Sequence, residues 1–284
     1  MIRRPPRSTP LYSSAASDVY KRQVQDDGKY NQHAVGFEGE HIYKVDHKIA
    51  DKLEEFSKLL FKGTLRHSYP HSWRSKAPLI YRNTPQWFIS MEKNNLRDIA
   101  LKSIDETIFY PPQGQTRLRS MIETRPDWCV SRQRVWGVPL PLFVNKKTGQ
   151  PLRDENIINR IADIYEKEGS NTWFTEDPQR FLGDEYSLDD YEQVKDVVEV
   201  WFDSGSTHAF CLEQREDLKW PASMYLEGSD QHRGWFHSSL LESSGTRGKA
   251  PYESVLTHGF VVDGRGRKMS KSLGNVISPD DILK

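Results

Sequence analysis

The stretch SMYLEGSDQHRGWFHSSLL, residues 223–241, indicates the architecture of the C-terminal part of the chain. It opens with an apolar run over 223–227, turns at Gly228 and continues in a helical pattern over 231–241. Apolar runs at 197–202 and 255–262 lie on either side and predict further strands, the second interrupted by His258 and Gly259. Strands that alternate with a helix in this way predict an α/β fold with a parallel sheet.

Polar side chains follow the strand predicted at 223–227. Glu227 ends this strand, Gly228 allows a tight turn, and Asp230 and Gln231 open the next helix. Ligands of open parallel sheets bind beyond the carboxyl ends of the strands. A carboxylate at Glu227 can hold an ammonium group or a ribose hydroxyl, and Gln231 offers both a donor and an acceptor. The alternative is a helix-capping acid beside a solvated Glu227.

A basic, glycine-flanked loop, GRGRKMSKSLGN at residues 264–275, follows the last predicted strand. Its cations include Lys268 and Lys271, and its hydroxyls include Ser270. Mobile cations beside hydroxyl and backbone donors suit a polyphosphate whose negative charge grows during a reaction. A generic basic loop would be a solvated surface patch. The Lys-Met-Ser-Lys-Ser string and its strand–loop–helix setting favour phosphate binding instead.

That string resembles the second signature of the class I aminoacyl-tRNA synthetases. Three further stretches, YLEGSDQHRGWF at 225–236, VWFDSGS at 200–206 and RPDWCVSRQRVWG at 125–137, are similar to the isoleucyl-tRNA synthetase family. Valyl and leucyl relatives share the outline of these motifs but differ in detail. The resemblance implies the C-terminal half of a Rossmann-like nucleotide-binding fold, with connective insertions and the end of an editing domain.

The resemblance also implies roles for individual residues. Lys268 and Lys271 would be catalytic, as stabilisers of the ATP phosphates, and Ser270, Lys271 and His258 would bind ATP. Trp201 and Trp235 resemble the walls of the isoleucine side-chain pocket, with ordinary core aromatics as the alternative. The residues expected to contact the aminoacyl-adenylate are Glu227, Gly228, Asp230, Gln231, Trp201 and Trp235.

Two departures from the family pattern limit these expectations. The other class I signature, His-x-Gly-His, is absent from the chain, so we expect half of the catalytic site upstream. Ser72 and Ser75 stand where many relatives carry Cys-x-x-Cys, and His67 and His71 do not complete a set of four zinc ligands. We therefore expect no structural zinc, no other metal site, and no catalysis by this chain alone.

Composition and resemblance together divide the chain into five expected parts. Residues 1–23 look like translated sequencing adapter, which predicts a non-native, disordered tail; a basic disordered tail is the alternative from composition. Residues 24–62 resemble the end of an editing domain, whose catalytic motif is expected upstream. Residues 63–144 would return into the catalytic domain, 145–192 would form a small connective insertion, and 193–284 would form the C-terminal half of the catalytic domain. The final residues have the sequence pattern of a helix start, and the sequence ends within that expected helix, so we expect a fragment.

Two helices are predicted inside these parts. An amphipathic helix capped by Asp46 would place Ile49, Leu53, Phe56 and Leu60 on one face. The acidic insertion carries a second predicted helix over 157–168.

The net charge, the cysteine count and the lengths of the apolar runs limit the partners and the cellular setting of the protein. The 40 basic and 40 acidic side chains cancel, so a nucleic-acid partner would be held by local basic patches. Two cysteines, Cys129 and Cys211, cannot form a disulfide framework and favour a reducing, cytoplasmic setting. No apolar run approaches 18 residues, which predicts no membrane span.

These expectations combine into a ligase fragment. The intact enzyme would activate isoleucine with ATP and Mg²⁺ to isoleucyl-adenylate, transfer it to tRNA(Ile) and edit mischarged tRNA. A valyl or leucyl enzyme is the alternative within the family. A metal hydrolase built on His67, His71, His232 and His237 lacks a carboxylate cluster, and a P-loop NTPase lacks Gly-x-x-x-x-Gly-Lys-Ser/Thr. A non-catalytic RNA-binding module is the alternative outside the family, on the basic residues Arg117, Arg119, Arg125, Arg132 and Arg134.

Overall fold

The computed structural model describes residues 2–4, 23–72, 75–134 and 136–283. The chain divides into two compact units at Trp87 and Phe88, inside strand β2 (Gln86–Ile89). The domain limits expected at 62, 144 and 192 stay predictions. Most of the expected tail 1–23 lies outside the described residues, although Ile2–Arg4 form a short strand, β1, that the sequence does not predict. In the C-terminal unit, the end of β2 pairs antiparallel with β4 (Trp128–Cys129), with Phe88 opposite Cys129.

The N-terminal unit contains the 3₁₀ helix η1 (Ile42–Lys44) and the helix α2 (Asp46–Glu55). The predicted amphipathic helix is confirmed over this range, but two details are wrong. Val45 rather than Asp46 is the N-cap, and the helix ends before Phe56 and Leu60. Ser57, at φ 53°, turns the chain out of the helix, and Leu60 is fully exposed.

A three-stranded parallel sheet forms the centre of the C-terminal unit, and the sequence predicts two of its three strands; the third is β3 (Ile108–Tyr110), in place of the strand expected at 197–202. Its order is β3, β10 (Ser254–His258), β9 (Tyr225–Gly228). Because side chains alternate along strands, the register gives two rows. Phe109, Val255 and Tyr225 form a buried row, whereas Tyr110 and Leu226 in the neighbouring row are about half exposed. One face of the sheet therefore carries the core.

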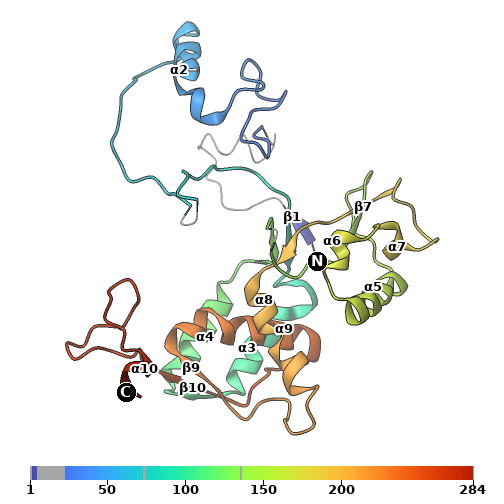
Figure 1. Cartoon of the computed structure of the whole chain (residues 1–284), viewed down its shortest axis with the longest axis vertical. Coiled ribbons are helices and arrows are strands. Elements are labelled where there is room, and N and C mark those ends of the chain that lie inside the picture. Colours follow the sequence, from blue (N-terminus) through green and yellow to red (C-terminus); the bar gives the residue numbers. More distant parts are fainter. Residues whose placement is uncertain (1, 5–22, 73–74, 135, 284) are drawn as a thin grey trace. The chain divides into compact units, whose positions relative to one another are not determined.

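Helices α3 (Leu96–Asp105), α4 (Gln113–Glu123) and α9 (Trp235–Arg247) pack together beside this sheet (Figure 1). The helical pattern predicted at 231–241 is confirmed as two pieces, the 3₁₀ helix η4 (Ser229–Arg233) and α9. They join at Gly234, whose backbone is not helical. Tyr252, buried between strands and helix, donates its hydroxyl hydrogen to the Phe236 carbonyl oxygen at 3.0 Å.

Two of the predicted strands are wrong in part. In the run 197–202, only Val197–Val198 form a strand, β8, which pairs antiparallel with β5 (Ser131–Arg132). The rest of the run enters the helix α8 (Val200–Gly205), because a short apolar run has no period that distinguishes strand from helix. The run 260–262 lies beyond the end of β10, and its three apolar side chains are exposed.

The insertion folds around its own core. Strands β6 (Phe143–Asn145) and β7 (Tyr191–Gln193) pair antiparallel, and the predicted helix is confirmed as α5 (Glu155–Glu168). The indole of Trp173 is fully buried and lies 4.9 Å from the ring of Phe181, centroid to centroid. The remaining described elements are η2 (Lys93–Asn95), α6 (Thr172–Thr175), α7 (Gln179–Leu182), the π-helix η3 (His208–Leu212) and α10 (Pro279–Ile282). None of the described helices has the length and apolar character needed to cross a membrane.

Candidate functional site

The carboxyl ends of β9 and β10 bring together residues that lie about thirty positions apart. Thr257 pairs with Glu227, and His258 pairs with Gly228. The side chains of Glu227 and His258 are exposed, so both are open to a ligand. A Cβ on Gly228 would lie 2.5 Å from Asp230 Oδ1, so a larger residue here would displace the exposed Asp230 side chain. Its φ of −64° is open to any residue, which corrects the expectation of a special turn conformation.

Gln231 has structural bonds on both ends of its side chain. Its Nε2 donates to Asp230 Oδ2 at 3.0 Å, and its Oε1 accepts from the backbone N–H of Trp235 at 3.0 Å. The second bond satisfies one of the free N–H groups at the start of α9. An amide retains one further hydrogen and one further lone pair, so Gln231 can still contact a ligand.

The two predicted pocket tryptophans come from different helices and meet at Gly234. A Cβ on Gly234 would lie 2.9 Å from Trp201 Cη2, so the Trp201 indole lies directly on this backbone. Trp235 Nε1 donates to the Ser204 carbonyl oxygen at 2.9 Å, and its ring stacks on Tyr225 with centroids 4.0 Å apart. Trp201 is 40% exposed, so its ring presents a free surface beside the end of β9.

A cavity of about 300 Å³ opens beside Trp201 and Gly234. Its wall carries charged residues that the sequence analysis does not assign to the site. Glu199 is central among them, because it accepts from Trp128 Nε1 at 3.1 Å and from the Arg132 guanidinium at 2.8 Å. These partners lie 71 and 67 positions away in the chain, so no local pattern predicts them. The other charged or ionisable lining residues are Arg125, Asp127, Cys129, Arg233 and His237.

Two buried groups of α9, of which His237 lines this cavity, have pKa values shifted toward their neutral forms. Burial, with smaller contributions from Arg125 and Arg233, lowers the pKa of His237 to about 3. Burial, with the nearby carboxylates of Asp203 and Glu199, raises the pKa of Glu242 to about 9. Helix α9 therefore carries two uncharged groups, the imidazole of His237 and the carboxylic acid of Glu242, and the second lies against Gly205 of α8.

The lysine loop, residues 264–275, follows β10 along the chain. Lys268 Nζ lies 3.4 Å from the centroid of the Phe260 ring, and Lys271 is exposed. Within the described residues, no hydrogen bond or ion pair joins either lysine to Glu227 or Gln231. Ser270 Oγ lies 3.2 Å from Ser272 Oγ. The assignment of these residues to ATP stays a prediction.

Side chains that could bind a metal ion do not gather in the described part of the chain. No three His, Cys, Asp or Glu side chains in the described ranges converge on a point where a metal ion would fit. His67 and His71 are separated by Tyr69, whose carbonyl oxygen lies 2.7 Å from His71 Nδ1. The expectation that the purified protein holds no structural zinc stays a prediction.

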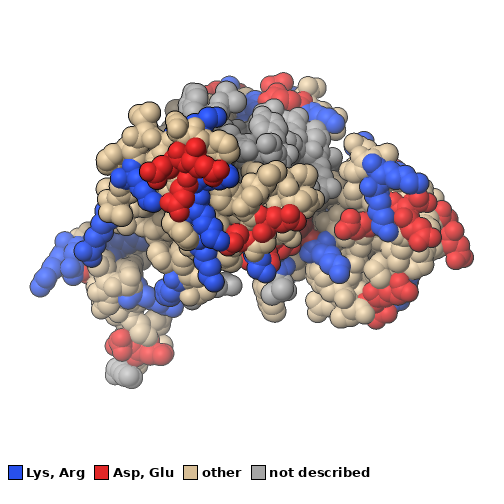
Figure 2. Space-filling model, turned by 90° about the horizontal axis from the view of Figure 1, so that it is seen from above, with Lys and Arg blue, Asp and Glu red and all other residues tan. Residues whose placement is uncertain are grey.

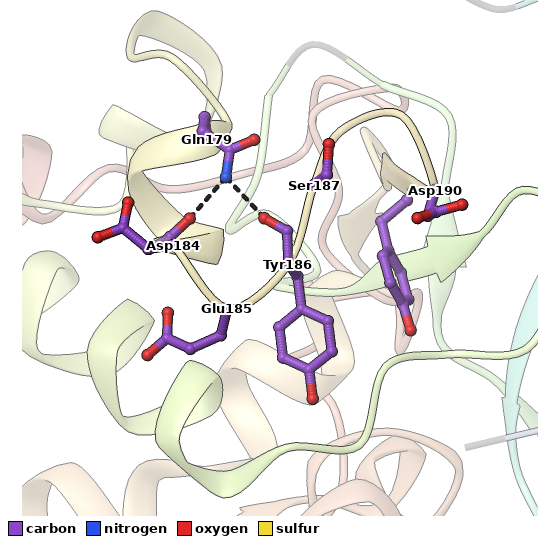
Figure 3. A pocket seen from close by; sticks show the side chains of 8 residues that line it. Gln179, Asp184, Glu185, Tyr186, Ser187 and Asp190 are labelled. Atoms are coloured by element: carbon purple, nitrogen blue, oxygen red, sulfur yellow. Dashed lines mark hydrogen bonds between the residues drawn. The ribbon is translucent and has the colours of Figure 1, made fainter.

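The insertion contains another pocket, of about 470 Å³ (Figure 3). Gln179 lies at its edge, but the amide of Gln179 is used structurally: it donates to the carbonyl oxygens of Gly183 at 2.6 Å and Tyr186 at 2.7 Å. Glu185, which also lines the pocket, pairs with Arg160. These groups hold the insertion together and do not form a reactive constellation.

Two of the five arginines that could bind RNA, Arg119 and Arg132, are paired with acids. Arg119 lies 2.6 Å from Asp105 and 3.0 Å from Glu123, and Arg132 pairs with Glu199. On the face shown in Figure 2, basic and acidic side chains alternate. No continuous cationic surface is seen on that face.

Comparison with known proteins gives a consistent result. Residues 11–284 match the family described as tRNA synthetases class I (I, L, M and V). The chain is 69% identical over 261 residues to the isoleucine–tRNA ligase of Pelagibacter ubique and 55% identical over 280 residues to that of Brucella abortus. In both cases the match covers 92% of this chain and 29% of the relative, so the chain spans less than a third of these relatives.

Among solved structures, methionyl-tRNA synthetase of Mycobacterium tuberculosis bound to methionyl-adenylate matches with a TM-score of 0.42 and 18% identity. The match covers 75% of this chain and 33% of that one, and at this score it adds nothing to the argument. The family match spans nearly the whole chain and includes both the turn after β9 and the lysine loop. The chain belongs to the class I tRNA synthetases of the isoleucine, leucine, methionine and valine group.

Proposed function

We propose that this chain is part of an isoleucine–tRNA ligase, a cytoplasmic enzyme that activates isoleucine with ATP and Mg²⁺ and transfers it to tRNA(Ile). One observation carries the proposal. Adjacent parallel strands, β9 and β10, end side by side, and the segments that follow them hold Glu227–Gln231 and the Lys268–Lys271 loop. Ligands of parallel α/β sheets bind at this edge.

The proposed chemistry needs no covalent nucleophile from the protein. The carboxylate oxygen of isoleucine attacks the α-phosphorus of ATP, and the bond from this phosphorus to the bridging oxygen of pyrophosphate breaks. Lys268 and Lys271 would stabilise the negative charge that gathers on the phosphates, and Ser270 and His258 would bind ATP. The protein therefore contributes positioning and charge.

The substrate's other groups would be held near the end of β9. The exposed carboxylate of Glu227 would hold the α-ammonium group or a ribose hydroxyl, beside Gly228, Asp230 and Gln231. Trp201, with its free face beside Gly234, and Trp235 would contact the isoleucine side chain. An apolar wall of this kind suits a branched aliphatic side chain.

The alternatives receive less support. The two relatives compared above are isoleucine ligases, which favours isoleucine over valine or leucine. A non-catalytic RNA-binding module would need free cations, and two of its five candidate arginines, Arg119 and Arg132, are paired with carboxylates. RNA affinity with a steep salt dependence and no ATP affinity would favour that module instead.

Amino-acid-dependent exchange of pyrophosphate into ATP tests the proposal. This chain alone should show no detectable exchange, because its lysines lack the opposing His-x-Gly-His segment. Joining the upstream half from a relative should restore exchange with isoleucine, and valine and leucine should support it far less. Robust exchange by the chain alone, or a joined enzyme that prefers valine or leucine, would contradict the proposal.

A further inference from the structure

The lysine loop is held together without an apolar core. Across residues 260–277 most side chains are exposed, including Leu273 at 61%, and four are partly buried: Asp263, Met269, Ser270 and Asn275. The Asp263 side chain is only 14% exposed, and Asn275 is half-buried. Three of these four side chains are polar, whereas the interior of a folded segment usually holds apolar ones.

Asp263 accepts hydrogen bonds from both sides of the loop. Its Oδ1 accepts from the backbone N–H groups of Arg265 and Arg267, both at 2.9 Å. Its Oδ2 accepts from Arg267 Nε and from Asn275 Nδ2, both at 3.0 Å. The Asn275 amide and the other donors lower the pKa of this carboxyl to about 2, so it is ionised at neutral pH.

Asn275 connects this carboxylate to the lysine string itself. Its Nδ2 donates to Asp263 and also to the Lys268 carbonyl oxygen, at 3.3 Å. Its Oδ1 accepts from the backbone N–H of Ser270 at 2.9 Å. One amide therefore joins the start, the middle and the end of the loop.

Closing a flexible loop has an entropic cost that these bonds offset. Gly266 and Gly274, at φ 75° and 64°, form the two tight turns that the closed path requires. If the loop were open in the free protein, binding of a polyphosphate would bear the cost of ordering it. A loop that is already closed presents its cations at lower cost.

We propose that Asp263 and Asn275 are positioning residues that close the loop 264–274 at its base, so that Lys268 and Lys271 project from a preformed loop toward a polyphosphate. The identity of that polyphosphate as ATP rests on the proposed function. The closure itself does not, because it is a property of the free chain.

Exchanging the two side chains tests the pairing. Asn275→Asp replaces the donor with an oxygen that faces Asp263, and Asp263→Asn places two amide N–H groups against each other. The double variant restores the bond between positions 263 and 275 in reversed order, and its carboxylate at position 275 can still accept from the Ser270 N–H. Arg267 Nε and the Lys268 carbonyl oxygen each lose one partner in this variant. Asp281→Asn is the control, because Asp281 caps α10 through the Ser278 N–H, outside the loop.

Amide hydrogen exchange of this chain without nucleotide, followed by mass spectrometry of the segment 264–275, is the first readout. Each single variant should exchange about tenfold faster, the double variant should exchange more slowly than either single variant, and the control should match the parent. Unchanged exchange in the single variants would overturn the proposal. Faster exchange that the double variant does not correct would also overturn it.

The joined enzyme gives the second readout. Both single variants should have a higher KM for ATP than the parent, and the double variant should have a lower KM than either single variant. An unchanged KM in variants with an open loop would overturn the positioning role. A joined parent enzyme with no pyrophosphate exchange at all would instead refute the proposed function, and the hydrogen-exchange result would still stand.

Discussion

Replacing Glu242 with glutamine should stabilise the protein at neutral and alkaline pH. The Glu242 side chain lies in α9, is 8% exposed, and its Oε1 has no hydrogen-bond partner in the described structure. It lies so close to α8 that a Cβ on Gly205 would be 2.1 Å from this oxygen. Burial and the nearby acids raise its pKa from 4.5 to about 9.

The direction of the pH effect follows from these values. The unfolded chain releases the proton near pH 4.5, whereas the folded chain keeps it until about pH 9. The contribution of the Glu242 carboxyl to the free energy of unfolding of the parent protein should therefore be greatest below pH 4.5. It should fall as the pH rises toward 9. At pH 7 the solution is 2.5 pH units above the unfolded-state pKa of 4.5, and this difference corresponds to a loss of about 3 kcal/mol in the free energy of unfolding.

Urea unfolding at pH 5 and pH 7, followed by circular dichroism and tryptophan fluorescence, measures this. Glu242→Gln should unfold with a free energy about 3 kcal/mol higher than the parent at pH 7 and within about 1 kcal/mol at pH 5. The control is Glu213→Gln, because Glu213 pairs with Arg247 of the same helix and its pKa is lowered. It should bring no gain at pH 7. If Glu242→Gln and the parent were equally stable at pH 7, the conclusion that the Glu242 carboxyl is buried and neutral in the folded protein would be refuted.

Three further outcomes are expected. The imidazole of His237, with a pKa of about 3, should show no change in its NMR chemical shifts between pH 5 and 8, and a midpoint near 6.5 would contradict its burial. Trp235→Phe should lower the free energy of unfolding by about 1–2 kcal/mol, because the Ser204 carbonyl oxygen loses its donor; in the same urea titration the more exposed Trp201→Phe should cost less. Elemental analysis of dialysed protein should find far less than one zinc per chain, since Ser72 and Ser75 are poor ligands, and stoichiometric zinc would disprove this.

The sequence predicts the parallel sheet and the helix after it because their signals are local. The apolar runs at β9 and β10 alternate with the helical pattern of α9, and this order alone implies parallel strands. The run at 197–202 is too short for its period to be read, and the structure places Trp201 on a helix. The end of α2 depends on Ser57, whose positive φ is not predictable from a serine.

The candidate site is predictable only where a motif lies within one segment. Glu227 and Gln231 follow a strand, so their placement beyond its carboxyl end follows from the order of elements. Glu199 and its partners Trp128 and Arg132 meet through folding of segments about seventy residues apart. The structural role of Gln231 depends on the direction of its side chain toward the Trp235 N–H, which composition does not encode.

The effect of Lys271→Ala on pyrophosphate exchange in the joined enzyme tests the central claim most directly. A cation that stabilises the departing phosphates acts mainly in the transition state, so the variant should lower kcat more than it raises KM for isoleucine. Lys249→Ala, which removes a cation that lies over the Trp220 ring, is the matched control and should leave both constants unchanged. A joined enzyme whose kcat is unaffected by Lys271→Ala would contradict the assignment of this loop to the phosphates of ATP.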